Sequence, residues 1–236
     1  MKAEYLSHVG AVRANNEDAV YCDSQSGVFI VADGVGGKED GEIASATAVR
    51  LVAEATWRAQ PEDDPAEVMR SAFYQANDLL HRKGHEAGRD GMGTTLTAAV
   101  CDEKQITIVH VGDSRAYLVN QSGIRQLTDD HSLVAQLVRD GRLTPEEAQD
   151  HPRRNILIRA IGQEALVEVD MVNTPWQKGD YLLLCSDGLY NLVSDREMQE
   201  LTVRNTLLST AVQFMAETAY NRGGYDNISV ILIAHD

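Results

Sequence analysis

Four short apolar segments of the chain each carry an aspartate near one end, next to a turn-forming residue. These segments are Phe29 to Gly34, Ile108 to Asp113, Leu182 to Gly188 and Gly223 to Ile233. Apolar runs of this length, bounded by turn residues, are typical of buried strands. A buried strand presents the carboxylate at its end from a stiff backbone, and glycine lets the chain turn tightly there. Four such segments in one chain predict carboxylates that converge on one place.

Converging carboxylates repel one another, and they stay ionised together only when a cation lies among them. The pattern therefore predicts a metal site. Oxygen ligands without histidine or cysteine select hard cations such as Mg²⁺ or Mn²⁺. Two such ions about 4 Å apart can activate a bridging water and support an in-line displacement. The alternative interpretation is a set of ordinary turn aspartates, since aspartate is a favoured turn residue.

Size and composition limit the classes of protein to which the chain can belong. Its 236 residues are 43% hydrophobic, which suits one globular domain. No apolar run is long enough to span a bilayer, and the start MKAEYLSHVG has no apolar signal region, so we expect a cytoplasmic protein. The formal net charge of -15 argues against nucleic acid or an anionic membrane as a partner. Three cysteines are expected to be free thiols of a reduced protein.

The order of the expected elements indicates antiparallel sheets. Two consecutive helices are expected after the early strands, one over 43–57 and one that starts at the Asp64-Pro-Ala-Glu67 cap. Because helices come in pairs and do not follow each strand, the sequence predicts an α+β fold and not a doubly wound parallel sheet. Strands are expected at 2–8, 19–24, 27–32, 96–100, 106–111, 116–119, 167–172, 181–186 and 229–233, with a long helix before the last one.

The polar segment from about 129 to 162 interrupts the strands. One short helix is expected around Leu133 to Val138, ended by Asp140-Gly141. A second is expected to start at Thr144-Pro-Glu-Glu147, which reads as a capping box. With few apolar side chains to hold it down, we expect this segment to be mobile.

Six motifs in order resemble the metal-dependent protein phosphatases of type 2C, most of all their compact bacterial members. The resemblance runs from about residue 8 to the C-terminus. Single motifs such as Ser-Asp-Gly are weak signals, but six in the family's order are specific. The motifs are Arg13-Ala-Asn-Asn-Glu17-Asp18, Asp33-Gly34-Val35-Gly36-Gly37, Gly91-Met-Gly-Thr-Thr95, Val111-Gly-Asp113-Ser-Arg115, Ser186-Asp187-Gly-Leu189 and Gly224-Tyr-Asp226-Asn227.

The resemblance implies one phosphatase domain over 1–236, with the flap at about 129–162 inserted in it. The implied fold is a four-layer sandwich of two antiparallel sheets flanked by antiparallel helix pairs. The implied activity is hydrolysis of phosphoserine and phosphothreonine in proteins, by direct attack of a water that bridges two Mn²⁺ or Mg²⁺ ions. We expect the flap to lie beside the site and to select protein substrates.

The resemblance also implies roles for individual residues. Asp33 would bridge the two metal ions, and the backbone carbonyl of Gly34 would bind the first of them. Asp187 and Asp226 would hold the second ion. Asp113, together with Asp187, would hold a third and weaker ion.

Five further motif residues complete the implied site. Glu17 and Asp18 match the family's acidic pair, which binds the second metal or its waters, and which of the two binds directly is open. Arg13 matches the arginine that clamps the substrate phosphate, and a planar guanidinium suits phosphate oxygens. Arg115 and Asn227 are expected to lie behind the ligands and to orient them.

One position departs from part of the family. Some members carry a histidine two places after the bridging aspartate, proposed as general acid, whereas this chain has Val35. The acid that protonates the leaving group is therefore open, with His131 the nearest candidate in motif order. Arg153 and Arg154 either guide an anionic substrate or are simply solvated.

The expected partners follow from the resemblance. They are phosphorylated proteins as substrates and a bacterial serine/threonine kinase as antagonist, and we expect a monomer. Two other functions are open: a hydrolase of small phosphate esters, and a catalytically weak relative that binds phosphoproteins. Loss of a metal ligand would mark the second, and no implied ligand is missing from this chain.

Overall fold

Two antiparallel β-sheets form the centre of the computed structural model, which describes residues 1–36, 40–60, 62–86 and 91–235. Gly37 of the second motif lies outside these ranges. In the first sheet the strand order is β1 (Lys2–His8), β11 (Ile228–Ala234), β10 (Tyr181–Cys185), β7 (Arg115–Asn120) and β8 (Gly123–Gln126). In the second it is β2 (Asp18–Asp23), β3 (Val28–Val35), β5 (Leu96–Cys101), β6 (Gln105–Val111) and β9 (Asp170–Pro175), and β4 (Gly93–Thr94) pairs with β3.

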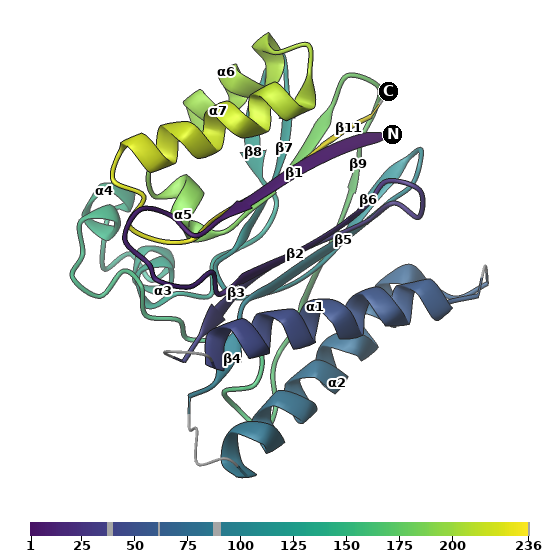
Figure 1. Cartoon of the computed structure of the whole chain (residues 1–236), viewed down its shortest axis with the longest axis vertical. Helices are drawn as coiled ribbons and strands as arrows, with labels where there is room; N and C mark the ends of the chain where they lie inside the picture. The colour runs from purple at the N-terminus through teal and green to yellow at the C-terminus, as the bar shows by residue number, and fades with distance from the viewer. Residues whose placement is uncertain (37–39, 61, 87–90, 236) are drawn as a thin grey trace.

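A pair of helices covers the outer face of each sheet, so that the chain forms four layers (Figure 1). The long helices α1 (Asp40–Arg58) and α2 (Pro65–Glu86) pack on the second sheet. Helices α6 (Asp195–Arg204) and α7 (Leu208–Asn221) pack on the first. The α+β sandwich predicted from the motifs is therefore confirmed.

The buried strands read as continuous apolar runs because both of their faces are covered. In β3, Ile30 and Ala32 face α1 and α2, whereas Phe29 and Val31 face the other sheet. Ile231 and Ile233 of β11 meet them in the layer between the sheets. Alternate residues of one strand thus serve two separate cores, and this double packing stiffens the strand ends that carry the aspartates.

Most predicted elements are present, but one strand lies further along the chain than predicted and some elements were not predicted. The strand predicted at 167–172 lies at Asp170–Pro175, because its pairing with β6 sets the register, and Val167 and Val169 pack against the helix-side core instead. Helix α6 was not predicted: it buries only Met198 and Thr202, and few of its other residues are apolar. The short β8 and the one-turn helix α5 (Asp187–Tyr190) were not predicted either.

The segment at 129–162 forms the two predicted short helices, α3 (Leu133–Arg139) and α4 (Pro145–Gln149). The capping box between Thr144 and Glu147 is present, and α3 ends at Asp140. Of these two helices only Val134 is buried. The two helices therefore bury one side chain between them.

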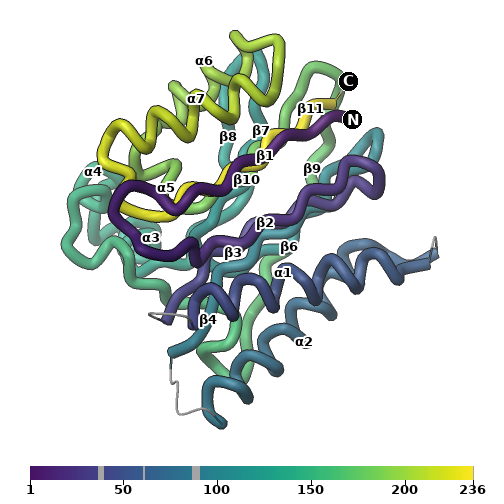
Figure 2. Tube along the Cα trace, viewed as in Figure 1, coloured from purple at the N-terminus to yellow at the C-terminus, as the bar shows by residue number. Residues whose placement is uncertain are grey.

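All the loops that carry the motifs gather at one end of the sandwich. In Figure 2 the turn between β1 and β2 runs beside the turn between α7 and β11, close to α3, α4 and α5. The two chain termini lie together at the opposite end, where Lys2 pairs with Ala234. Within the described ranges, no helix has the length and apolarity needed to cross a bilayer.

Candidate active site

Five aspartates from both sheets meet at the end of the sandwich. Asp33 lies near the end of β3 and pairs in register with Asp18, the first residue of β2. Asp187 lies two residues after the end of β10, as the first residue of α5. Asp113 lies two residues after β6, and Asp226 two residues before β11. The charges of the other four all raise the pKa of Asp33.

The electrostatics of the cluster are those of crowded carboxylates. Desolvation, followed by the charge of neighbouring aspartates, holds the pKa of Asp33 and of Asp187 well above the usual range. Desolvation and Asp130 raise the pKa of Asp113 to about 7. Desolvation raises the pKa of Asp18 to about 6, against the opposing hydrogen bonds from Ser229 and Ser186. Ionising all of these groups together is unfavourable without a cation.

The oxygen atoms of the cluster fit a hard cation. The buried Oδ1 atoms of Asp18 and Asp187 have no hydrogen-bond partner in the described structure, and a buried anionic oxygen without a partner is costly. Among the described residues, no three histidine, cysteine or acidic side chains form a ready metal cage. Mg²⁺ does not need one, since it keeps several waters and binds one or two carboxylates. The donor set therefore suits Mg²⁺ or Mn²⁺ and not zinc.

Two buried hydroxyl groups fix the aspartates from behind. Ser186 donates to Asp18 Oδ2 at 2.7 Å and accepts from the backbone N–H of Ser229 at 3.0 Å. Thr95 Oγ1 accepts from the backbone N–H of Asp33 at 2.8 Å and lies 2.8 Å from Ser114 Oγ. The bond from Ser186 to Asp18 joins residues 168 positions apart. The only sign of it in the sequence is the position of Ser186 next to Asp187.

Asn227 pins the loop that carries Arg13. Its Nδ2 donates to the backbone oxygens of Val9 and Asn15, both at 2.9 Å, and its Oδ1 accepts from the N–H of Glu17 at 2.8 Å. Asn227 therefore joins the turn before β11 to the loop between β1 and β2. A side chain at Gly10 would place its Cβ 2.2 Å from the backbone oxygen of Asp226, so only glycine fits there.

Arg13 lies at the edge of the aspartate cluster. Its Nη2 is 2.8 Å from Asp226 Oδ2, and 47% of its side chain is exposed. The pKa of Arg13 is raised: burial lowers it, but the carboxylates of Asp226, Glu17 and Asp33 outweigh that effect. The guanidinium is thus accessible to a ligand that enters the cluster.

Glu17 and Asp18 point to different surroundings. A Cβ on Gly41 would lie 3.0 Å from the carboxylate of Glu17, so this side chain packs against the start of α1. Burial raises the pKa of Glu17, Arg13 opposes the rise, and Asp226 and Glu42 add to it. Gly34 also lies against the start of α1, since a Cβ on Gly34 would be 2.1 Å from the backbone oxygen of Gly41.

Neither Val35 nor His131 presents a proton to the cluster. Valine has no ionisable group, and the ring of His131 is 3% exposed. His131 Nδ1 accepts from the N–H of Gly112 at 3.0 Å, and its Nε2 lies 3.1 Å from Asp170 Oδ2. With both ring nitrogens occupied, His131 holds the root of the flap to the sheet.

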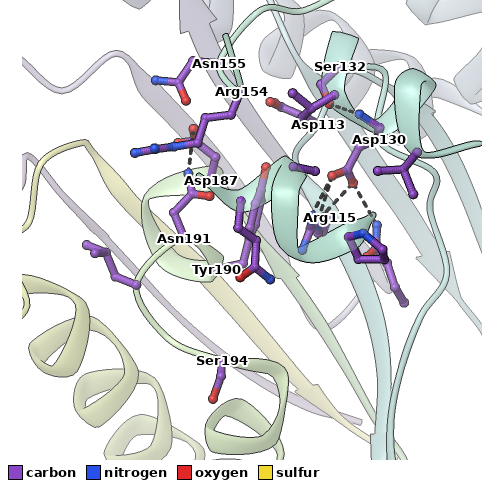
Figure 3. Close-up of a pocket in the computed structure, with 18 of the residues that line it drawn as sticks. Asp113, Arg115, Asp130, Ser132, Arg154, Asn155, Asp187, Tyr190, Asn191 and Ser194 are labelled. Carbon is purple, nitrogen blue, oxygen red and sulfur yellow. Dashed lines mark hydrogen bonds and ion pairs between the residues drawn. The ribbon is translucent and has the colours of Figure 1, made fainter. Parts of the chain in front are cut away.

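A cleft of about 760 Å³ leads from the aspartates into the space between the flap and the body of the molecule. Asp113, Asp187 and Arg154 of the flap all line it, and Arg154 lies next to Asp187 in Figure 3. Arg115 and Asp130 lie at its base, joined by short hydrogen bonds (Figure 3). Arg115 makes no direct hydrogen bond to any of the five clustered aspartates among its described contacts.

Comparisons with known proteins agree with this geometry. The family model described as "Protein phosphatase 2C" matches residues 7–222. The serine/threonine phosphatase stp of Listeria monocytogenes is 42% identical over 245 residues, covering 100% of this chain and 96% of that protein. The crystal structure of the Mycobacterium tuberculosis serine/threonine phosphatase PstP/Ppp has a TM-score of 0.91 at 35% identity, covering 99% of this chain and 97% of that one.

A structure of the PstP catalytic domain was determined in complex with two manganese ions. It superposes with a TM-score of 0.89 at 34% identity, and covers 99% of this chain and 97% of that chain. The family match extends over most of the chain, and the relatives match along nearly their whole length. The chain therefore belongs to the protein phosphatase 2C family.

Proposed function

We propose that this serine/threonine phosphatase of the 2C type hydrolyses phosphoserine and phosphothreonine in proteins by direct attack of water on phosphorus at the aspartate cluster. One observation carries the proposal: five aspartates converge beside an accessible arginine, and two of them have buried oxygens without a partner. When bound, two Mn²⁺ or Mg²⁺ ions would activate the water and neutralise charge on the phosphate.

The proposed ligands are the residues at the strand ends. Asp33, the carbonyl of Gly34, Asp187 and Asp226 would hold the two ions. Asp18 supports this arrangement, because Ser186 fixes one carboxylate oxygen and leaves the other free. We favour Asp18 over Glu17 as the direct contact for that reason. Asp113 with Asp187 would hold a third, weaker ion.

Arg13 is proposed to bind the phosphate of the substrate. Phosphoryl transfer develops charge on the phosphoryl oxygens, and a planar guanidinium can donate two parallel hydrogen bonds to them. Its ion pair with Asp226 supports this role, because it places the guanidinium beside a proposed metal ligand. Val35 has no proton to give and both ring nitrogens of His131 are occupied, so we infer that the leaving group takes its proton from solvent in the site.

The flap at 129–162 is proposed to select protein substrates. The cleft runs between the flap and the body from Asp113 and Asp187 outward, so a peptide held by its phosphate would extend along it. Arg154 lines the cleft and is the proposed contact for anionic groups of the substrate. A serine/threonine kinase as antagonist and a monomeric state stay predictions of the family resemblance.

Phosphate release from a phosphoserine peptide tests the proposed site. Asp33→Asn should remove nearly all turnover at saturating Mn²⁺, because it neutralises the central carboxylate. It should also raise the melting temperature of the metal-free protein, since it relieves repulsion with the other aspartates. The matched control is Asp78→Asn on the exposed surface of α2, which should behave as wild type. Wild-type turnover in Asp33→Asn would show that the centre lies elsewhere.

A further inference from the structure

The guanidinium of Arg115 lies between two functional parts of the molecule. Arg115 is the first residue of β7 and lies two residues after Asp113. Its Nε and Nη2 donate to the carboxylate of Asp130, at 2.9 Å to Oδ1 and 2.7 Å to Oδ2. Its Nη1 donates to the hydroxyl of Tyr117 at 3.0 Å. The two side chains of the ion pair are only 22% and 12% exposed, so water screens it weakly.

One face of the guanidinium covers the ring of Tyr190. The distance from Arg115 Cζ to the ring centroid is 3.7 Å, which is a close cation–π contact. Tyr190 is the last residue of α5, and Asp187 is the first. The contact therefore joins Arg115 to the element that presents a carboxylate to the cluster.

Helix α5 needs such a contact. It has only four residues, and its N-cap Ser186 makes no side-chain capping bond. One helical turn has little stability of its own, so its position depends on the packing around it. At its other end, Asn191 Nδ2 donates to Asp187 Oδ2 at 3.2 Å. The orientation of Asp187 thus depends on what holds Tyr190.

The other partner, Asp130, lies at the root of the flap. It directly precedes His131 and Ser132, and Ser132 caps α3 through its side chain. Gln126 Nε2 also donates to Asp130 Oδ1 at 2.8 Å, and Arg139 Nη1 donates to the backbone oxygen of Asp130 at 3.2 Å. Movement of Asp130 would therefore move the beginning of the flap.

We propose that Arg115 is a positioning residue that holds α5 and the root of the flap with one guanidinium. Through Tyr190 it sets the direction of Asp187, and through Asp130 it anchors the flap beside the same carboxylate. The proposal rests on the proposed function, because it takes Asp187 as a metal ligand. Lysine cannot replace this residue: an ammonium group has no planar fork for Asp130 and no flat face for Tyr190.

The first test measures Mn²⁺ binding to the folded protein by calorimetry, independently of turnover. Arg115→Lys should raise the dissociation constant of a site that uses Asp187 by about 10- to 100-fold, the usual effect of removing a residue that orients a ligand. Tyr190→Leu, which removes the ring, should do the same. Tyr190→Phe keeps the ring and should bind Mn²⁺ as wild type does.

The matched control is Arg125→Lys, on the neighbouring strand β8, whose side chain contacts Thr174 at 3.3 Å. It should leave Mn²⁺ binding unchanged. A residue that only stabilised the fold would lower the melting temperature without changing the Mn²⁺ affinity of the folded protein. Wild-type affinity in folded Arg115→Lys would therefore overturn the proposal. If Arg115→Lys does not fold, wild-type affinity in Tyr190→Leu overturns it instead.

The second test separates the two contacts of Arg115. At saturating Mn²⁺, Arg115→Lys should raise the KM for a phosphoserine peptide more than Tyr190→Leu does, because only Arg115→Lys weakens the bond to Asp130. Equal KM values in the two variants would overturn the proposal that Arg115 anchors the flap through Asp130. If the wild-type protein binds no Mn²⁺, the proposed function itself is overturned. If Asp187→Asn weakens Mn²⁺ binding but Arg115→Lys does not, only the inference about Arg115 is overturned.

Discussion

The aspartates of the cluster control how stability depends on pH when no metal is bound. Their pKa values are raised in the folded state, to about 7 for Asp113 and well above the usual range for Asp33 and Asp187. In the unfolded chain the value is near 3.8. The folded protein therefore holds more protons than the unfolded chain, and it loses stability as pH rises through the folded pKa values.

We predict that the melting temperature of the metal-free protein falls between pH 6.5 and 8. Below this window the buried His110 has the opposite effect. Desolvation lowers its pKa to about 4. Its contribution to stability therefore rises with pH up to about 6.5, the usual pKa of histidine. Mn²⁺ would bind the ionised carboxylates, so the rise in melting temperature on adding Mn²⁺ should grow with pH. Scanning fluorimetry in chelator measures the metal-free melting temperature, and the same scan in excess Mn²⁺ measures its rise. A metal-free melting temperature that rises across this window would contradict the electrostatic account.

Arg13 should affect substrate binding more than the chemical step. Arg13→Ala removes the guanidinium proposed to bind the phosphate, so we expect KM for a phosphoserine peptide to rise by about tenfold or more, equivalent to about 1.4 kcal/mol. Arg13→Lys keeps the charge, so its KM should lie between that of the wild type and that of Arg13→Ala. Steady-state kinetics at saturating Mn²⁺ separate the effects. A large loss of kcat at unchanged KM would assign Arg13 a role in the transition state alone.

At the scale of elements, the flap is the part whose role is most open to test. The bridge between Ser132 and Leu157 closes its base, so residues 134–155 can be replaced by a short glycine-rich linker while that bridge is kept. We predict that kcat/KM for a phosphoprotein falls by about tenfold or more, whereas kcat/KM for a small aryl phosphate changes much less. The reason is that only the larger substrate would extend along the cleft in the proposed mode of binding. Equal losses for both substrates would show that the segment is structural.

The elements also show what the sequence can and cannot predict. Strands with apolar residues on both faces, such as β3 and β11, were predicted because their runs are continuous and end at glycine or asparagine. Helix α6 was missed because its buried residues are few, although the capping box of Ser194 and Glu197 marks its start. The register of β9 was missed because pairing with β6, and not its own apolar pattern, determines it.

The same limit applies to the site. Residue types and spacing predicted the converging aspartates, and the family resemblance gave Arg13 and Asn227 their places. The contacts behind them were not predictable: Ser186 with Asp18, and Arg115 with Asp130 and Tyr190. They depend on how the two sheets stack and where the flap joins, and no periodicity along the chain encodes this.

At the scale of the whole molecule, the site exists only when both ends of the chain are in place. Arg13 and Asp226 are 213 positions apart, and Glu17 contacts Asn227 across 210. The pairing of β1 with β11 brings these segments together, and β2 with β3 adds Asp18 and Asp33. Assembly of the cluster therefore reports on folding of the entire sandwich.

The central claim is that this assembled cluster is a Mn²⁺- or Mg²⁺-dependent phosphatase centre. The most direct measurement is phosphate release from a phosphoserine peptide by chelator-treated protein, as Mn²⁺ is titrated back. We predict no turnover in excess chelator, recovery that saturates with Mn²⁺ or Mg²⁺, and poor recovery with zinc, for which the cluster offers no imidazole or thiolate ligand. Full turnover in excess chelator would contradict the account.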